Sequence, residues 1–192
     1  MQVSSEFESD IIEIIKNRRS RRAFVSKPVE NEKIKSLFEA ARWAPSSVNE
    51  QPWAYIYATA AQKELWTKIF EALNEGNKIW SKEAPLLVVS LARKYYSKND
   101  RPNASAKYDV GAANAFLSLQ ATELGLNVHQ MGGFDQSLLR QNLNVPENFD
   151  IGVVMAIGYA GNPEQLPVGL RDRERSPRLR HIQHEFVMNH TF

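Results

Sequence analysis

The chain has 192 residues, enough for one domain with a substantial core, and its 43% hydrophobic and 24% charged residues are ordinary for a globular protein. With 24 Lys and Arg against 22 Asp and Glu, its net charge of +2 is too small for a protein whose main partner is nucleic acid. The absence of Cys excludes disulfides, thiolate catalysis and zinc–thiolate sites, and the longest apolar run, 84–92, is too short to span a bilayer, so we expect a cytoplasmic protein with no membrane partner.

The first half of the chain alternates predicted helices and strands. Apolar residues recur at helical spacing in three segments, which are 10–17, 31–43 and 61–73. Asp10 is the expected N-cap of the first of these helices. Two segments, 53–59 and 86–92, are alternating or continuously apolar and read as strands.

The second half begins with a polar loop, 93–106, followed by an Ala-rich helix over 108–124 with Gly125 at its C′ position. The small residues of this helix permit close packing of another helix. A short strand opening at 128, a turn, a helix capped by Asp135 and a strand at 153–159 complete the pattern. Helices and strands mix throughout, which indicates an α/β or α+β class in one domain.

The last 30 residues show many charges, three prolines and no periodicity. A coreless segment of this length is unusual in a compact monomer. It is either disordered or ordered by lying across a partner subunit, and we favour the second interpretation.

Arginines concentrate near both ends of the chain, with four in 18–22 and five in 171–180. Guanidinium groups hold phosphate through charge-assisted hydrogen bonds, so the two clusters predict one anion site if the fold brings them together. Taken singly, each cluster also fits a solvated basic turn or tail, or a weak nucleic-acid patch.

Two further segments are rich in groups that can contact a ligand. The segment Ala44-Pro45-Ser46-Ser47-Val48-Asn49-Glu50-Gln51-Pro52-Trp53 offers hydroxyls and amides between two prolines, which suits a flat polar heterocycle. The segment Gln130-Met131-Gly132-Gly133-Phe134-Asp135 lets backbone N–H groups approach a ligand closely. Ordinary capping and turn roles are the alternative for both.

The order and spacing of these segments resemble the nitroreductase superfamily of FMN-dependent dimeric reductases. The resemblance runs from Ile11 to the tail, and its most specific part is Arg18-x-Ser20-x-Arg22-x-Phe24 followed about 20 residues later by Ala-Pro-Ser-Ser-x-Asn-x-Gln-Pro-Trp. It implies an α+β nitroreductase-like fold with a central, mostly antiparallel sheet flanked by helices. It also implies a single domain over 1–192 whose 162–192 extension is swapped onto the partner in a homodimer.

The resemblance assigns FMN contacts residue by residue. It places Arg18, Arg19 and Ser20 on the phosphate and ribityl chain, with Arg178 and Arg180 as the late basic pair on the phosphate. On the ring it implies Arg22 at the N1/O2 edge, Asn77 at the pyrimidine side, and the turn of Met131, Gly132 and Gly133 at N5. From the partner subunit it implies contacts by Pro45, Ser46, Ser47 and Asn49. No side chain is expected to act as a nucleophile or general base.

The implied function is ping-pong electron transfer from NADH or NADPH through FMN to a small-molecule acceptor such as a nitroaromatic or quinone. Three alternatives remain open: an FMN storage or sensory module, a relative with another flavin reaction such as dehalogenation, flavin fragmentation or azoline oxidation, and a nucleic-acid binder resting on 18–22. The sequence departs from the superfamily at 130–132, where many members have a proline or an acidic residue. Tyr95 and Tyr96 are candidates for the acceptor pocket.

Overall fold

A computed structural model of the protein describes residues 1–191, and its centre is a four-stranded antiparallel sheet. The strands lie in the order β2-β3-β5-β4. Their bounds are β2 Trp53–Thr59, β3 Leu86–Arg93, β4 Asn127–Met131 and β5 Phe149–Gly158. The expected mostly antiparallel α+β architecture is therefore confirmed.

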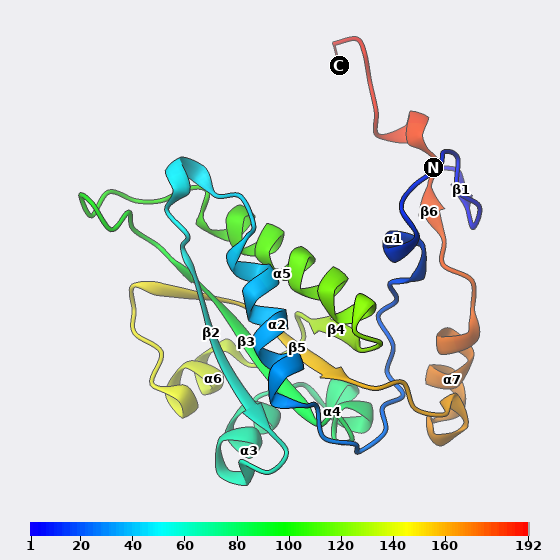
Figure 1. Cartoon of the computed structure of the whole chain (residues 1–192), viewed down its shortest axis with the longest axis horizontal. Coiled ribbons are helices and arrows are strands. Elements are labelled where there is room, and N and C mark those ends of the chain that lie inside the picture. The colour runs from blue at the N-terminus through cyan, green and yellow to red at the C-terminus, as the bar shows by residue number, and fades with distance from the viewer. Residues whose placement is uncertain (192) are drawn as a thin grey trace.

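Helices cover both faces of this sheet (Figure 1). Side chains of Leu86 and Val88 pack with α2 (Asn31–Arg42) and α5 (Ala106–Glu123). The alternate residues Leu87 and Val89 pack on the other face with α3 (Lys63–Glu71), α4 (Glu75–Ser81) and α6 (Gln136–Leu143). Successive side chains of a strand point to opposite faces, which explains why a strand covered on both sides is continuously apolar.

The two ends of the chain meet at one side of this body (Figure 1). Strand β1 (Val3–Ser4) pairs antiparallel with β6 (Arg180–His181). Beside them lie the short helix α1 (Glu13–Asn17) and the tail helix α7 (Val168–Arg175). Three 3-10 turns, η1 Ser47–Asn49, η2 Pro163–Gln165 and η3 Gln183–Glu185, complete the elements of residues 1–191.

Most predicted elements lie where the pattern put them. The strand predicted over 53–59 has those bounds, the helix over 31–43 ends one residue early, and the Ala-rich helix covers 106–123. Gly125 follows that helix with φ +72°, and the Asp135 carboxylate accepts the Leu138 N–H at 2.9 Å, as expected of a C′ glycine and an N-cap.

Two predicted elements begin at other residues than expected, and two helices were not predicted. The first helix begins at Glu13 with Ile12 as N-cap, and the Asp10 carboxylate instead contacts Lys16 Nζ at 3.0 Å. Helices α4 and α7 were not expected. Strand β5 begins at Phe149, before the predicted 153, because Phe149, Asp150 and Ile151 also pair with β3, opposite Arg93, Ala92 and Leu91.

The tail of the described chain is ordered against its own N-terminal segment, so the interpretation of a disordered tail does not hold for residues 163–191. Among residues 1–191 there is no helix long and apolar enough to cross a membrane.

Candidate functional site

The arginines from the two ends of the chain come together. Arg178 donates through Nη1 to the Arg18 carbonyl oxygen at 2.6 Å and through Nη2 to the carbonyl oxygen of Lys16. The Arg18 guanidinium in turn donates to Ser20 Oγ at 3.3 Å. The tail thus holds the arginine-rich turn in place, and the predicted meeting of the two clusters is found.

The cluster carries concentrated positive charge. The pKa of Arg18 is lowered by burial and by the neighbouring charges of Arg178, Arg180 and Arg19, and that of Arg178 is lowered in the same way. Like charges held this close disfavour each other, so the cluster favours an anion between them.

Two cavities flank Arg18. One, of about 320 Å³, is bounded by the N-terminal segment 4–7, Arg18, Arg178 and Arg180. The other, of about 370 Å³, is lined by polar Arg18, Ser20, Ser118 and Gln130 and by the apolar residues Ile15, Ala115, Leu119 and Val128. A charged rim beside a mixed apolar and polar wall suits a ligand with a phosphate on one end and a flat ring system on the other.

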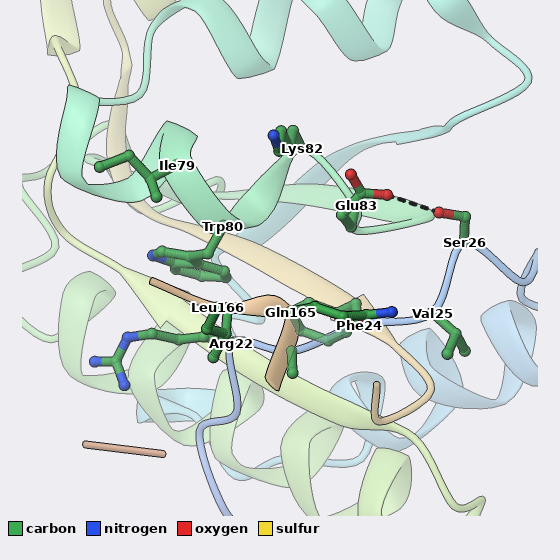
Figure 2. Close-up of a pocket in the computed structure, with 11 residues that line it drawn as sticks. Arg22, Phe24, Val25, Ser26, Ile79, Trp80, Lys82, Glu83, Gln165 and Leu166 are labelled. Carbon is green, nitrogen blue, oxygen red and sulfur yellow. Dashed lines mark hydrogen bonds between the residues drawn. The ribbon is translucent and has the colours of Figure 1, made fainter. Parts of the chain in front are cut away.

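Arg22 lies two residues beyond Ser20 in the arginine-rich segment 18–22. It borders a cavity of about 400 Å³ with Phe24, Trp80, Leu166 and other residues (Figure 2). In this view its guanidinium lies on the side opposite the Ser26–Glu83 hydrogen bond, the same side as the Trp80 indole nitrogen.

His129 lies on β4, and its ring is close to the charge of Arg22. Its ring lies 4.6 Å from the Trp80 ring, and Nδ1 lies 3.0 Å from the Arg21 carbonyl oxygen. Because a carbonyl oxygen only accepts, Nδ1 carries the proton. Burial, together with the charge of Arg22, lowers the His129 pKa to about 4, so this histidine is neutral at pH 7.

Asn77 and the glycine turn meet across the sheet edge. The Asn77 side-chain amide donates to the Gly133 carbonyl oxygen at 3.0 Å, and the Asn74 N–H donates to the same oxygen at 3.0 Å. A Cβ on Gly133 would lie 2.3 Å from Asn74 Nδ2, whereas a Cβ on Gly132 would meet nothing within 4 Å. A side chain at position 133 would therefore have to displace the Asn74 amide, position 132 has open space, and Met131 is buried in the core.

Within one chain, the segment of Pro45, Ser46, Ser47 and Asn49 lies apart from the arginine cluster around Arg18. It lies at the N-terminal end of α5, where the Ser47 N–H donates to the buried Asp109 carboxylate at 3.1 Å. Arg18 and Ser20 adjoin α5 at Ser118, nine residues and roughly 14 Å further along the helix.

The backbone of this loop is unusual. Val48, Asn49 and Gln51 all adopt positive φ, at 47°, 58° and 52°. Such conformations cost energy for residues other than Gly and occur often at functional sites. The Ser46 hydroxyl accepts the Gln51 N–H at 3.0 Å, and Ser47 Oγ lies 3.5 Å from the Tyr96 hydroxyl, so contacts from several directions hold the strained loop.

Sequence reasoning missed Glu174, Asp109 and Trp80. Glu174 and Asp109 are buried beside the predicted site residues Arg22 and Ser47, which lie 152 and 62 positions away in the sequence. Trp80 is buried against His129, which was not predicted and lies 49 positions away. No local pattern signals such contacts. The acid Glu174 stands in a run of arginines and looks like part of a solvated face. Residues 1–191 hold no group of three or more His, Asp or Glu side chains placed to bind a metal ion.

Comparison with known proteins agrees with this geometry. The profile of the Nitroreductase family matches residues 15–159. A protein of Archaeoglobus fulgidus whose name includes NADH dehydrogenase/NAD(P)H nitroreductase is 29% identical over 156 residues, covering 78% of this chain and 85% of its own.

Solved structures give the same picture. An oxidoreductase described as containing FMN superposes with a TM-score of 0.92 at 31% identity, over 97% of this chain and 95% of that one. An FMN-dependent nitroreductase of Clostridium difficile R20291 is 29% identical with a TM-score of 0.65, over 81% and 94%. The chain belongs to the nitroreductase family.

Proposed function

We propose that this protein is an FMN-dependent oxidoreductase that passes electrons from NADH or NADPH to a small acceptor such as a quinone or nitroaromatic. The observation that carries the proposal is the convergence of Arg18, Arg178 and Arg180 beside a half-open cavity with an apolar wall. FMN, when bound, supplies the two-electron chemistry that no side chain of this sequence offers.

The residues present fit this cofactor. Arg18, Arg19, Ser20, Arg178 and Arg180 would hold the phosphate and ribityl chain, because burial and the like charges of Arg178, Arg180 and Arg19 lower the pKa of Arg18, and a bound anion relieves this repulsion. Arg22 would face the pyrimidine edge and stabilise negative charge there. Because a Cβ on Gly132 would meet nothing within 4 Å, a ring could approach this residue closely, while Asn77 and Gly133 fix each other.

The site is completed by a second copy of the chain. Helix α5 presents an exposed apolar stripe in which Tyr108 is 82% and Phe116 41% exposed. The members of the stripe follow helical spacing: Tyr108, Gly111, Ala115 and Phe116 are exposed, and Ala112 and Leu119 are half-buried at its edge. Since Ala115 and Leu119 also line the cavity beside Arg18, a partner packed on this stripe would border the cofactor. Its Pro45–Asn49 loop, displaced from the cluster of its own chain, is our candidate for the partner contact.

One exposed ring face cannot hold donor and acceptor together, which predicts ping-pong kinetics. Steady-state oxidation of NADH and of NADPH is measured against a quinone and a nitroaromatic at several fixed donor concentrations. Parallel double-reciprocal lines support the proposal. Intersecting lines would refute the ping-pong order. A protein that binds FMN stoichiometrically but turns over neither donor would instead be a storage or sensory module.

A further inference from the structure

The carboxylate of Glu174 is buried against the segment that carries Arg22. Glu174 is 5% exposed and its side chain 2% exposed. Its two oxygens accept the Arg22 backbone N–H at 3.0 and 3.1 Å, and Oε1 lies 3.4 Å from the Ala23 N–H. Oε2 is also 4.0 Å from Arg22 Nη1. A single buried acid therefore contacts both the backbone and the guanidinium of Arg22.

The helix that carries this acid is itself fixed to the same segment. The Arg19 guanidinium donates to the carbonyl oxygens of Ser176, at 2.7 Å, and Glu174, at 3.4 Å, at the C-terminal end of α7. A cation suits the negative end of a helix dipole. Residues 19–23 and 174–176 are thus joined in both directions, which leaves the Glu174 side chain little freedom to move relative to Arg22.

Burying a carboxylate is costly unless hydrogen bonds and charges compensate it. Glu174 meets this condition through two backbone donors and one guanidinium, all from residues 22–23. It also lies beyond residue 159, where the match to the family profile ends. The contact therefore joins the tail helix to the segment that carries Arg22.

We propose that Glu174 is a positioning residue for Arg22: it fixes the backbone at 22–23 and the direction of the guanidinium, so that the tail helix sets how Arg22 faces the flavin. This rests on the proposed function, in which Arg22 stabilises negative charge at the pyrimidine edge. Loss of the carboxylate would release Arg22 and act as if Arg22 itself were removed.

The experiment compares Glu174→Ala, Glu174→Asp and Glu174→Gln with Arg22→Ala in the full chain, and measures FMN affinity by fluorescence and the midpoint potential of bound FMN. Glu174→Ala and Glu174→Asp are expected to weaken FMN binding by about tenfold, because one to two charge-assisted contacts lose their geometry. Both should shift the potential to more negative values, and Arg22→Ala is expected to do the same. Glu174→Gln keeps an acceptor oxygen at the same place and should restore most of the affinity.

The matched control is Asp172→Ala, because Asp172 is an exposed acid on the same helix whose carboxylate pairs with Arg171. It should leave both affinity and potential unchanged. A double variant, Glu174→Ala with Arg22→Ala, should be no worse than Arg22→Ala alone, since neighbours acting through one group are not additive.

The outcomes separate three roles. If Glu174→Ala and Glu174→Gln shift the potential equally to more positive values, Glu174 acts by its charge alone and positioning is refuted. If the variants lower the melting temperature but leave the potential unchanged, the role is only structural and the proposal also fails. Should Glu174→Ala not fold, Glu174→Asp decides between these results. A wild-type chain that binds no FMN would instead overturn the proposed function.

Discussion

Arg178 links the tail to the phosphate side of the candidate site. Its guanidinium holds the Arg18 and Lys16 carbonyl oxygens, and its positive charge adds to that of Arg18 and Arg180. Its removal therefore affects both the shape of the turn and the charge offered to an anion. Arg180 differs from Arg178. Within residues 1–191 its guanidinium donates only to the adjacent Leu179 carbonyl oxygen. Both arginines line the cavity that is bounded by the N-terminal segment 4–7 and Arg18.

We expect Arg178→Ala with Arg180→Ala to release FMN, since each lost charge-assisted bond to a phosphate costs about 1.5–3 kcal/mol. The measurement is the flavin absorbance retained after dialysis. Arg173→Ala with Arg175→Ala is the control, because it removes two exposed arginines of α7 that line neither cavity beside Arg18. A double variant at 178 and 180 that stays fully yellow would count against the phosphate assignment.

His129 gives the site a pH-dependent contribution to stability. Its pKa is about 4 in the folded chain and near 6.5 when unfolded, so between these values the unfolded chain binds more protons. The stabilisation is therefore present above pH 6.5 and is lost as the pH falls towards 4, by roughly 2–3 kcal/mol.

The check is the melting temperature of wild type and His129→Gln from pH 7 to pH 4. The glutamine amide can still donate to the Arg21 carbonyl oxygen but does not titrate. The wild type should lose more stability over this range than the variant does. Identical pH profiles would show that His129 is not held neutral by its surroundings.

Among the helices and strands, hydrophobic periodicity correctly predicts those that have one clear apolar face or are buried throughout. That holds for α2, α5 and β3, whose buried residues follow the spacing seen in the sequence. Helix α4 was missed because it is seven residues long and contains Gly76, and it is stabilised by the Asn74 cap and by the Gly133 turn, which lies far away in the sequence. Helix α7 was missed because its one buried residue is an acid, Glu174.

The same contrast applies to the site. The arginine segments and the glycine turn could be predicted, because charge and small residues leave a local trace in the sequence. The contacts of Glu174, Asp109 and Trp80 could not, because each depends on a partner brought close only by the folded sheet and tail.

Helix α5 carries the prediction on assembly. Ala115 lies in the exposed apolar stripe and borders the cavity beside Arg18, so Ala115→Arg places a charge at both the proposed dimer interface and the proposed flavin site. We expect this variant to be monomeric and to bind FMN at least about tenfold more weakly, because an unpaired buried charge is costly. Light scattering and fluorescence titration measure the two effects.

Thr67→Arg is the matched control for that variant. It makes the same change of charge at an exposed position of α3, on the other face of the sheet. It should remain dimeric and yellow. An Ala115→Arg protein that stays dimeric with unchanged FMN affinity would remove α5 from the interface.

In the whole molecule, the proposed FMN site needs residues from two chains. In one chain the arginine cluster adjoins α5 at Ser118, whereas the Ser46–Asn49 loop lies at the N-terminal end of this helix, and only a partner would bring a second loop to the cluster. The charge cluster, the exposed α5 stripe and the strained loop are then parts of a single arrangement.

Sedimentation velocity recorded at both the protein and the flavin absorption bands tests this arrangement most directly. If two chains share one FMN site, flavin should sediment with a dimer of the 21.9 kDa chain at one FMN per chain. Little flavin should accompany any monomer that is present. Flavin that sediments with the monomer at full occupancy, or a pure dimer that binds none, would contradict it.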